Sequence, residues 1–141
     1  MRLPGLVACA VLLATPAVAA PAADAAPQPR DCSRLQTQAD MNDCAAANFK
    51  AADAVLNRLY GKLMAAQRDA GGKARLRAAE RAWVAYRDGE CTFDVGPREE
   101  GGTIWPMMWF GCLREKTAAR ARELQHHLDC PAELACPVGK K

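Results

Sequence analysis

The sequence is poor in residues that favour β-structure, and it lacks an apolar run long enough to span a membrane. β-Branched residues are scarce. The longest uncharged apolar stretch, Leu6–Ala14, has nine residues, whereas a transmembrane helix needs about 20. The chain also has no internal repeat. These absences favour an all-α protein of one domain with no transmembrane segment.

Motifs that carry catalysis or metal binding are also missing. The chain has no Cys-x-x-Cys pair, and its two histidines, His126 and His127, are adjacent and cannot both face one metal on a helix. No serine elbow, zinc motif or phosphate loop is present. The sequence therefore predicts no catalytic residue, no metal and no cofactor.

The N-terminus has the features of an export signal. Arg2 supplies a positive charge, Leu6–Ala14 an apolar core, and Ala17–Ala19 a small-x-small cleavage pattern, which predicts a signal peptide over 1–19. Leu6–Cys9 resembles a lipobox, but most of the apolar core follows the cysteine, which favours cleavage over lipidation. The mature chain is expected in the periplasm or outside the cell. Its net charge of +2, after removal of Arg2, predicts no nucleic-acid partner.

Export places the cysteines in an oxidising compartment. Cleavage removes Cys9 and leaves an even set of six, which allows 15 pairings. Local pairing is favoured, and the disulfides expected from it are Cys32–Cys44, Cys91–Cys112 and Cys130–Cys136. In the third pair, either cysteine could instead reach back to the body of the domain.

Helical patterning begins at Thr37, where Thr37–Asp40 approximates a capping box. From there to Asp69 the chain has no proline and one glycine, Gly61, and its small and apolar residues recur at helical spacing. This predicts a first helix over 37–69, about 50 Å long.

Two further helices are predicted. Gly71–Gly72 is expected to form the turn before a second helix over 73–93. A glycine-rich loop follows, and a third helix begins at Pro106 and runs to about residue 127. The expected fold is all-α, a small three-helix antiparallel arrangement with a long first helix, stapled by disulfides because its core is thin.

The predicted domain organisation has four parts. Residues 1–19 form the signal peptide and 20–31 a disordered leader rich in proline and alanine. Residues 32–128 form the helical domain, and 129–141 an irregular tail with cysteines.

Polar residues form stripes on the first two helices. Asp53, Asn57 and Tyr60 share one face of the first helix, and Glu80 and Arg87 share one face of the second. If these faces meet, Asp53 or Asn57 would bond the Arg87 guanidinium. We interpret these five residues as a structural polar network that fixes helix register; a carboxylate active site is the alternative.

The segment 92–111 combines charge with aromatic and methionine side chains. Cys91–Cys112 would close it into a loop. Tryptophan and arginine are favoured interface anchors, and methionine adapts to partners. The candidate partner-binding residues are Arg98, Trp105, Met108 and Trp109. The alternative is that the two tryptophans and Met108 cap the core.

The ordered motifs resemble those of one family. The first half of the pattern is Cys32, Met41–Cys44, and Asp53-x-x-Leu56-Asn57-x-x-Tyr60. The second is Arg81-Ala82-Trp83-x-x-Tyr86-Arg87-Asp88-x-x-Cys91, then Gly101–Gly102, Cys112, and Thr117-x-x-Arg120-x-x-x-Leu124. Together they are similar to the LprI-like family of secreted bacterial proteins, named after a lipoprotein described as a lysozyme inhibitor. The family often has glutamine where this chain has Glu80.

The resemblance implies a non-enzymatic protein of the periplasm or cell exterior whose partner is lysozyme. From its residues, the loop 92–111 is the part that we expect to bind this partner. The alternative of another class is a structural or stress-related envelope component that binds other envelope proteins. A small hydrolase is a third, remote alternative. It requires Asp53, Glu80 and Arg87 to open into one cleft. Oligomeric state cannot be deduced from the sequence.

Overall fold

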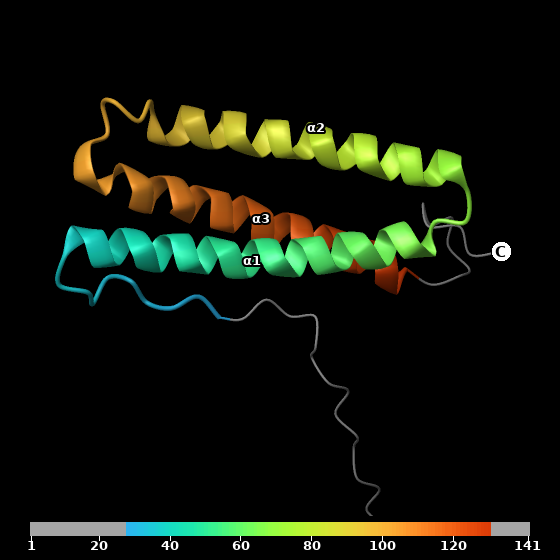
Figure 1. The fold of residues 1–141 in the computed structure, drawn as a ribbon, viewed down its shortest axis with the longest axis horizontal. Helices are drawn as coiled ribbons and strands as arrows, with labels where there is room; N and C mark the ends of the chain where they lie inside the picture. Colours follow the sequence, from blue (N-terminus) through green and yellow to red (C-terminus); the bar gives the residue numbers. More distant parts are fainter. Residues whose placement is uncertain (1–27, 131–141) are drawn as a thin grey trace, which may run out of the picture.

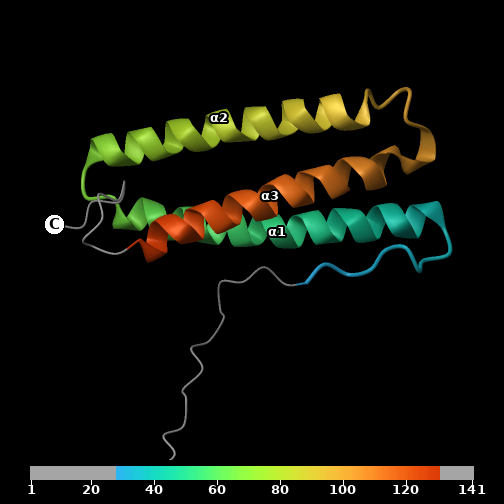
Figure 2. The ribbon, with the colours of Figure 1, turned by 180° about the vertical axis from the view of Figure 1, so that it is seen from behind.

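Three long helices make up most of residues 28–130, the part of the chain that the computed structural model describes (Figure 1). α1 spans Gln38–Ala66, α2 spans Ala70–Val95 and α3 spans Trp105–Asp129; a 3-10 turn, η1, covers Gly102–Ile104 before α3. Successive helices are antiparallel, as the opposite view also shows (Figure 2). The all-α arrangement is confirmed. The predicted signal peptide, most of the leader and Cys136 lie outside the described residues.

α1 begins as the sequence predicted. The Thr37 hydroxyl accepts a hydrogen bond from the Asp40 backbone N–H at 3.1 Å and donates one to the Asp40 carboxylate at 2.6 Å. This arrangement satisfies one of the free N–H groups at the start of the helix. The helix then continues through Gly61 to Ala66.

The turn between α1 and α2 lies earlier than predicted. Gly71 and Gly72 belong to the first turn of α2, and the connection is made by residues 67–69. The Asp69 carboxylate caps α2 by accepting from the Gly72 N–H at 2.6 Å. A Cβ on Gly72 would lie 2.6 Å from the Gln67 side-chain oxygen, so glycine allows this close approach. The acidic cap therefore outweighs the low helix propensity of the two glycines.

The hydrophobic core lies mainly between α1 and α3, whose backbones pack along most of their length. Its buried members are Val55, Leu56, Leu59, Leu63, Ala121 and Leu124. Burial of one leucine side chain stabilises the fold by about 1.5–3 kcal/mol.

α2 is covered much less. It packs against α3 and scarcely approaches the backbone of α1. Its buried residues are Gly72, Arg87 and Cys91, with no large aliphatic side chain among them. Leu76 and Trp83 reach the core from α2 but remain partly exposed.

None of the helices within 28–130 combines the length and apolarity needed to cross a membrane.

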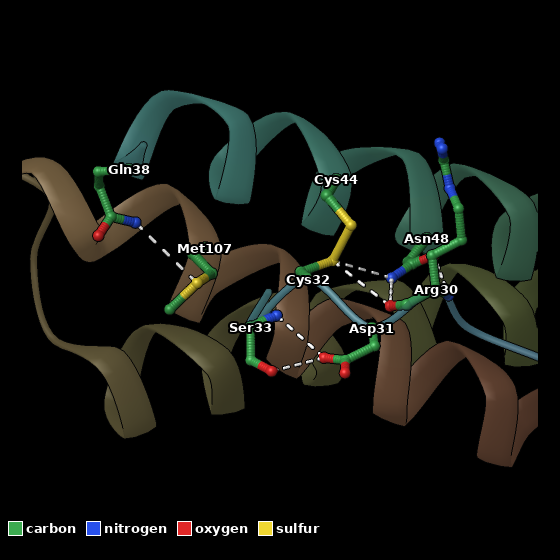
Figure 3. Close-up of a disulfide and its surroundings, with 8 residues drawn as sticks. All are labelled: Arg30, Asp31, Cys32, Ser33, Gln38, Cys44, Asn48 and Met107. Carbon is green, nitrogen blue, oxygen red and sulfur yellow. Dashed lines mark hydrogen bonds between the residues drawn. A yellow bond between two sulfur atoms is a disulfide. The ribbon is translucent and has the colours of Figure 1, made fainter. Parts of the chain in front are cut away.

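The segment before α1 is fixed to the bundle by the disulfide Cys32–Cys44 (Figure 3). The Asn48 side chain clamps the same segment. It accepts from the Arg30 N–H and donates to the Arg30 carbonyl, both at 2.9 Å. The Asp31 carboxylate accepts from the Ser33 hydroxyl and N–H at 2.6 and 3.0 Å, which lowers the pKa of Asp31. Side-chain contacts thus order the chain as it enters α1.

Candidate functional site

The connection between α2 and α3 forms one end of the bundle, opposite the α1–α2 turn (Figure 1). The disulfide Cys91–Cys112 joins the last turns of α2 to the first turns of α3. Cys91 is fully buried. The residues between the two cysteines, 92–111, form a covalently closed segment that we call the 92–111 loop. Of the third expected pair, Cys136 is outside the described residues.

Trp105 holds the 92–111 loop from within. Its indole N–H donates to the Gly96 carbonyl at 3.0 Å. Gly96 ends α2 with a φ of +78°, a conformation that favours glycine. A Cβ on Gly101 would overlap the Trp105 side chain, so the loop backbone lies directly against the indole. The structure thus gives Trp105 an anchoring role.

Stacked rings continue from Trp105 along α3. The indoles of Trp105 and Trp109 stack with centroids 5.2 Å apart and planes 13° apart. The Arg98 guanidinium lies 5.8 Å from the Trp105 ring centroid. The Asn42 amide of α1 donates to the Thr103 carbonyl at 2.9 Å and so fixes η1. The loop is therefore attached to both of its helices and to α1.

The outer surface of the loop has both charge and apolar groups. Arg98 is exposed, whereas Trp105 and Trp109 are half-buried. Met108 and Ile104 are about half exposed, at 49% and 46%. Of the four predicted binding residues, Arg98 and Met108 offer accessible side chains, and Arg98 lies against Trp105.

Sequence reasoning missed Phe93 and Ile104. Phe93 is 85% exposed, the highest value among the large apolar residues described. It lies two positions after Cys91, and two residues correspond to about 200° around a helix. Because Cys91 faces α3, Phe93 must point away. Helical spacing from the cysteine could have revealed this.

Arg87 is buried where all three helices meet, but its partners differ from those expected. Its guanidinium bonds the neighbouring Asp88 carboxylate at 2.8 Å and reaches the Thr117 hydroxyl of α3 at 3.4 Å. The rings of Phe49 and Trp83 lie 5.6 and 5.2 Å from it. Aromatic faces and one carboxylate thus compensate this buried charge.

The remaining members of the predicted network form separate pairs. Asn57 donates to Asp53 at 2.8 Å on α1. Glu80 accepts from Arg120 of α3 at 3.1 and 3.2 Å, with both side chains 15% exposed. Tyr60 packs against the core. The expected bond from Asp53 or Asn57 to Arg87 is not formed within residues 28–130. Asp53 and Asn57 pair with each other, and Arg87 bonds Asp88 of its own helix and Thr117 of α3.

The geometry does not produce a hydrolytic centre from these residues. Glu80 lines a groove between α1 and α2 that Asp53 and Arg87 do not line, and Asp53 and Arg87 are each held by other partners, Asn57 and Asp88. Within 28–130, no three histidine, cysteine or acidic side chains are grouped closely enough to hold a metal ion. His126 and His127 lie in the last turn of α3, where they complement the helix dipole.

Charge is distributed unevenly between the two ends of the bundle. The half nearest the 92–111 loop, residues 30–49 and 87–116, has six basic and nine acidic residues, a formal charge of −3. The other half, 50–86 and 117–129, has ten basic and five acidic residues, a formal charge of +5. Because these two charges partly cancel, the small net charge of the whole chain does not reveal the difference between the two ends.

Comparison with known proteins gives a consistent result. The family model described as lysozyme inhibitor LprI matches residues 30–124. An uncharacterised protein of Rhizobium meliloti (strain 1021) is 38% identical over an alignment 122 positions long, and the match covers 78% of this chain and 86% of that protein. No solved structure matches. The matched residues include α1, α2, most of α3, both described disulfides and the 92–111 loop, and the chain belongs to the LprI family.

Proposed function

We propose that this protein is a non-enzymatic inhibitor of lysozyme that binds the enzyme through the 92–111 loop. The family description supports the activity. The observation that carries the location is the fixation of the loop by Cys91–Cys112, by Trp105 and by Asn42. A loop ordered before binding loses less conformational entropy on association.

Charge supports the same surface. A basic animal lysozyme favours an acidic partner surface, and the loop belongs to the half of the bundle with a formal charge of −3. Lysozyme also cleaves its substrate with two carboxylates in a long cleft. Arg98 is exposed at the tip of the loop and supplies a cation suited to such carboxylates.

The apolar side chains complete the proposed contact. Met108, Ile104 and Phe93 are exposed at the same end of the bundle. Interfaces combine a few buried anchors with a polar rim. In this proposal Arg98 enters the cleft and the apolar side chains contact its margin.

A lytic assay with stoichiometric purified protein and bacterial cell walls tests the activity. We expect lysis to fall as the protein approaches equimolar amounts. With Arg98→Glu, at least about tenfold more protein should be needed for the same inhibition. Arg75→Glu, an exposed arginine at the other end of α2, is the matched control and should leave inhibition unchanged. Undiminished lysis with several lysozyme types would refute the proposal.

A further inference from the structure

An open groove runs between α1 and α2, away from the 92–111 loop. It forms because α1 and α2 both pack on α3 without closing against each other. Its volume is about 630 Å³, within the usual range for ligand sites. Asn57 and Tyr60 line it from α1, and the lining residues from α2 are Arg77, Glu80, Arg81, Val84 and Ala85.

The groove has a net positive character. The Glu80 carboxylate bonds Arg120, which also pairs with Glu123, and the charged residues that line the groove, Arg77, Arg81 and Glu80, have a formal sum of +1. Arg77 and Arg81 are exposed and form no ion pair with other residues in 28–130. Since they are four residues apart on α2, their Cβ atoms lie about 6 Å apart on one face. The rim therefore presents two adjacent cations.

The rest of the wall suits a polypeptide. Val84, which is 37% exposed, and Ala85 offer apolar contact beside the cations. The Asn57 amide nitrogen is used by Asp53 at 2.8 Å, which leaves its carbonyl oxygen as an acceptor for a peptide N–H. In an extended chain, side chains two residues apart lie on one face about 6.6 Å apart. This matches the spacing of the two arginines.

From this geometry we infer that the α1–α2 groove binds an acidic polypeptide segment of a protein partner. Two carboxylates of the segment, two residues apart, pair with Arg77 and Arg81, and an apolar side chain two residues further along the same face contacts Val84. Arginine–carboxylate pairs supply charge-assisted hydrogen bonds with defined geometry. The groove shares no residue with the 92–111 loop, so this inference does not depend on lysozyme inhibition.

Fluorescence anisotropy with a labelled peptide that has two glutamates and then a leucine at alternate positions, separated by serines, tests the inference. We expect saturable binding that weakens at least about tenfold when Arg77→Gln and Arg81→Gln are combined. The matched control combines Arg75→Gln with Arg122→Gln, which removes the same charge from exposed residues outside the groove. The control should change binding by less than about twofold.

Three results would overturn the inference. They are no binding at millimolar peptide, equal losses in both double variants, and binding of anionic phospholipid vesicles in place of the peptide. Equal losses would indicate attraction by overall charge. NMR of the unaltered protein keeps the test valid if a variant fails to fold. Peptide should shift the Val84 methyl signals and leave the Phe93 ring signals in place, and the reverse pattern would also contradict a groove site.

Discussion

α1 and α2 have similar lengths, yet they are held in place by different forces. α1 contributes Val55, Leu56, Leu59 and Leu63 to a shared apolar core with α3. α2 has a buried arginine, a disulfide cysteine and the partly buried Glu80–Arg120 pair. Burial of apolar surface is non-directional, whereas polar and covalent contacts fix orientation. The difference suggests that α1 and α3 supply most of the stability and that α2 is positioned by a few specific contacts.

The surface follows the same division. On α2, Val84, Tyr86 and Phe93 are all exposed large apolar residues, whereas on α1 no residue of this kind is exposed. The loosely covered helix also borders the groove and leads into the 92–111 loop. Both proposed binding surfaces therefore involve the helix that contributes least to the core.

Leu59→Ala should have the largest effect on stability. Leu59 is 1% exposed at the centre of the α1–α3 core, and truncation of a buried leucine costs about 3–4 kcal/mol through lost burial and the remaining cavity. Urea unfolding followed by circular dichroism measures it. Val84→Ala on α2 is the control, with a change below about 0.5 kcal/mol. Similar losses at both sites would contradict the contrast between the helices.

Removal of the Cys91–Cys112 disulfide should have the next largest effect. Replacing both cysteines by serine opens a loop with a sequence separation of 21 residues, and the chain-entropy estimate for such a loop is about 3 kcal/mol. We expect urea denaturation to show this loss of stability. The circular dichroism spectrum of the folded variant should still be that of a helical protein. A loss below about 1 kcal/mol would mean that Trp105 and Arg87 position α2 without the disulfide.

Glu80→Gln should have a moderate effect. Glutamine keeps the shape of the side chain and can accept from Arg120, which also retains Glu123 at 2.8 Å. The expected loss is about 1 kcal/mol, again measured by urea unfolding. The control is Glu115→Gln, because Glu115 is exposed and its pair with Arg114 should contribute little. An equal loss at both positions would remove the proposed role of Glu80–Arg120 in holding α2.

Asp69→Ala should have a small and local effect. Loss of an N-cap costs about 1 kcal/mol, and α2 has few buried contacts near its start. Native-state hydrogen exchange should show faster exchange in the first turns of α2 and little change at Leu59. If amide exchange in α1 became faster by the same factor as in α2, the two helices would open together, which would contradict a separate opening of α2.

Much of the fold could be predicted because it depends on local chemistry. Thr37–Asp40 caps α1, Pro106 lies in the first turn of α3, and the spacing of leucines marks the apolar face. The local pairings Cys32–Cys44 and Cys91–Cys112 are both present. The predicted position of the first turn, at Gly71–Gly72, was wrong. The Asp69 cap starts α2 ahead of these glycines and outweighs their low helix propensity.

The sequence by itself determined the helices, their faces and the cysteines that can reach each other, because each depends on residues near in the chain. Only the tertiary structure decided which polar groups are partners. Arg87 meets Thr117, and Glu80 meets Arg120, across separations of 30 and 40 residues. Helical spacing fixes the direction of a side chain on its own helix, but not which helix lies opposite it. Because α3 packs against both α1 and α2, it supplies those partners, and the side between α1 and α2 stays open as a groove.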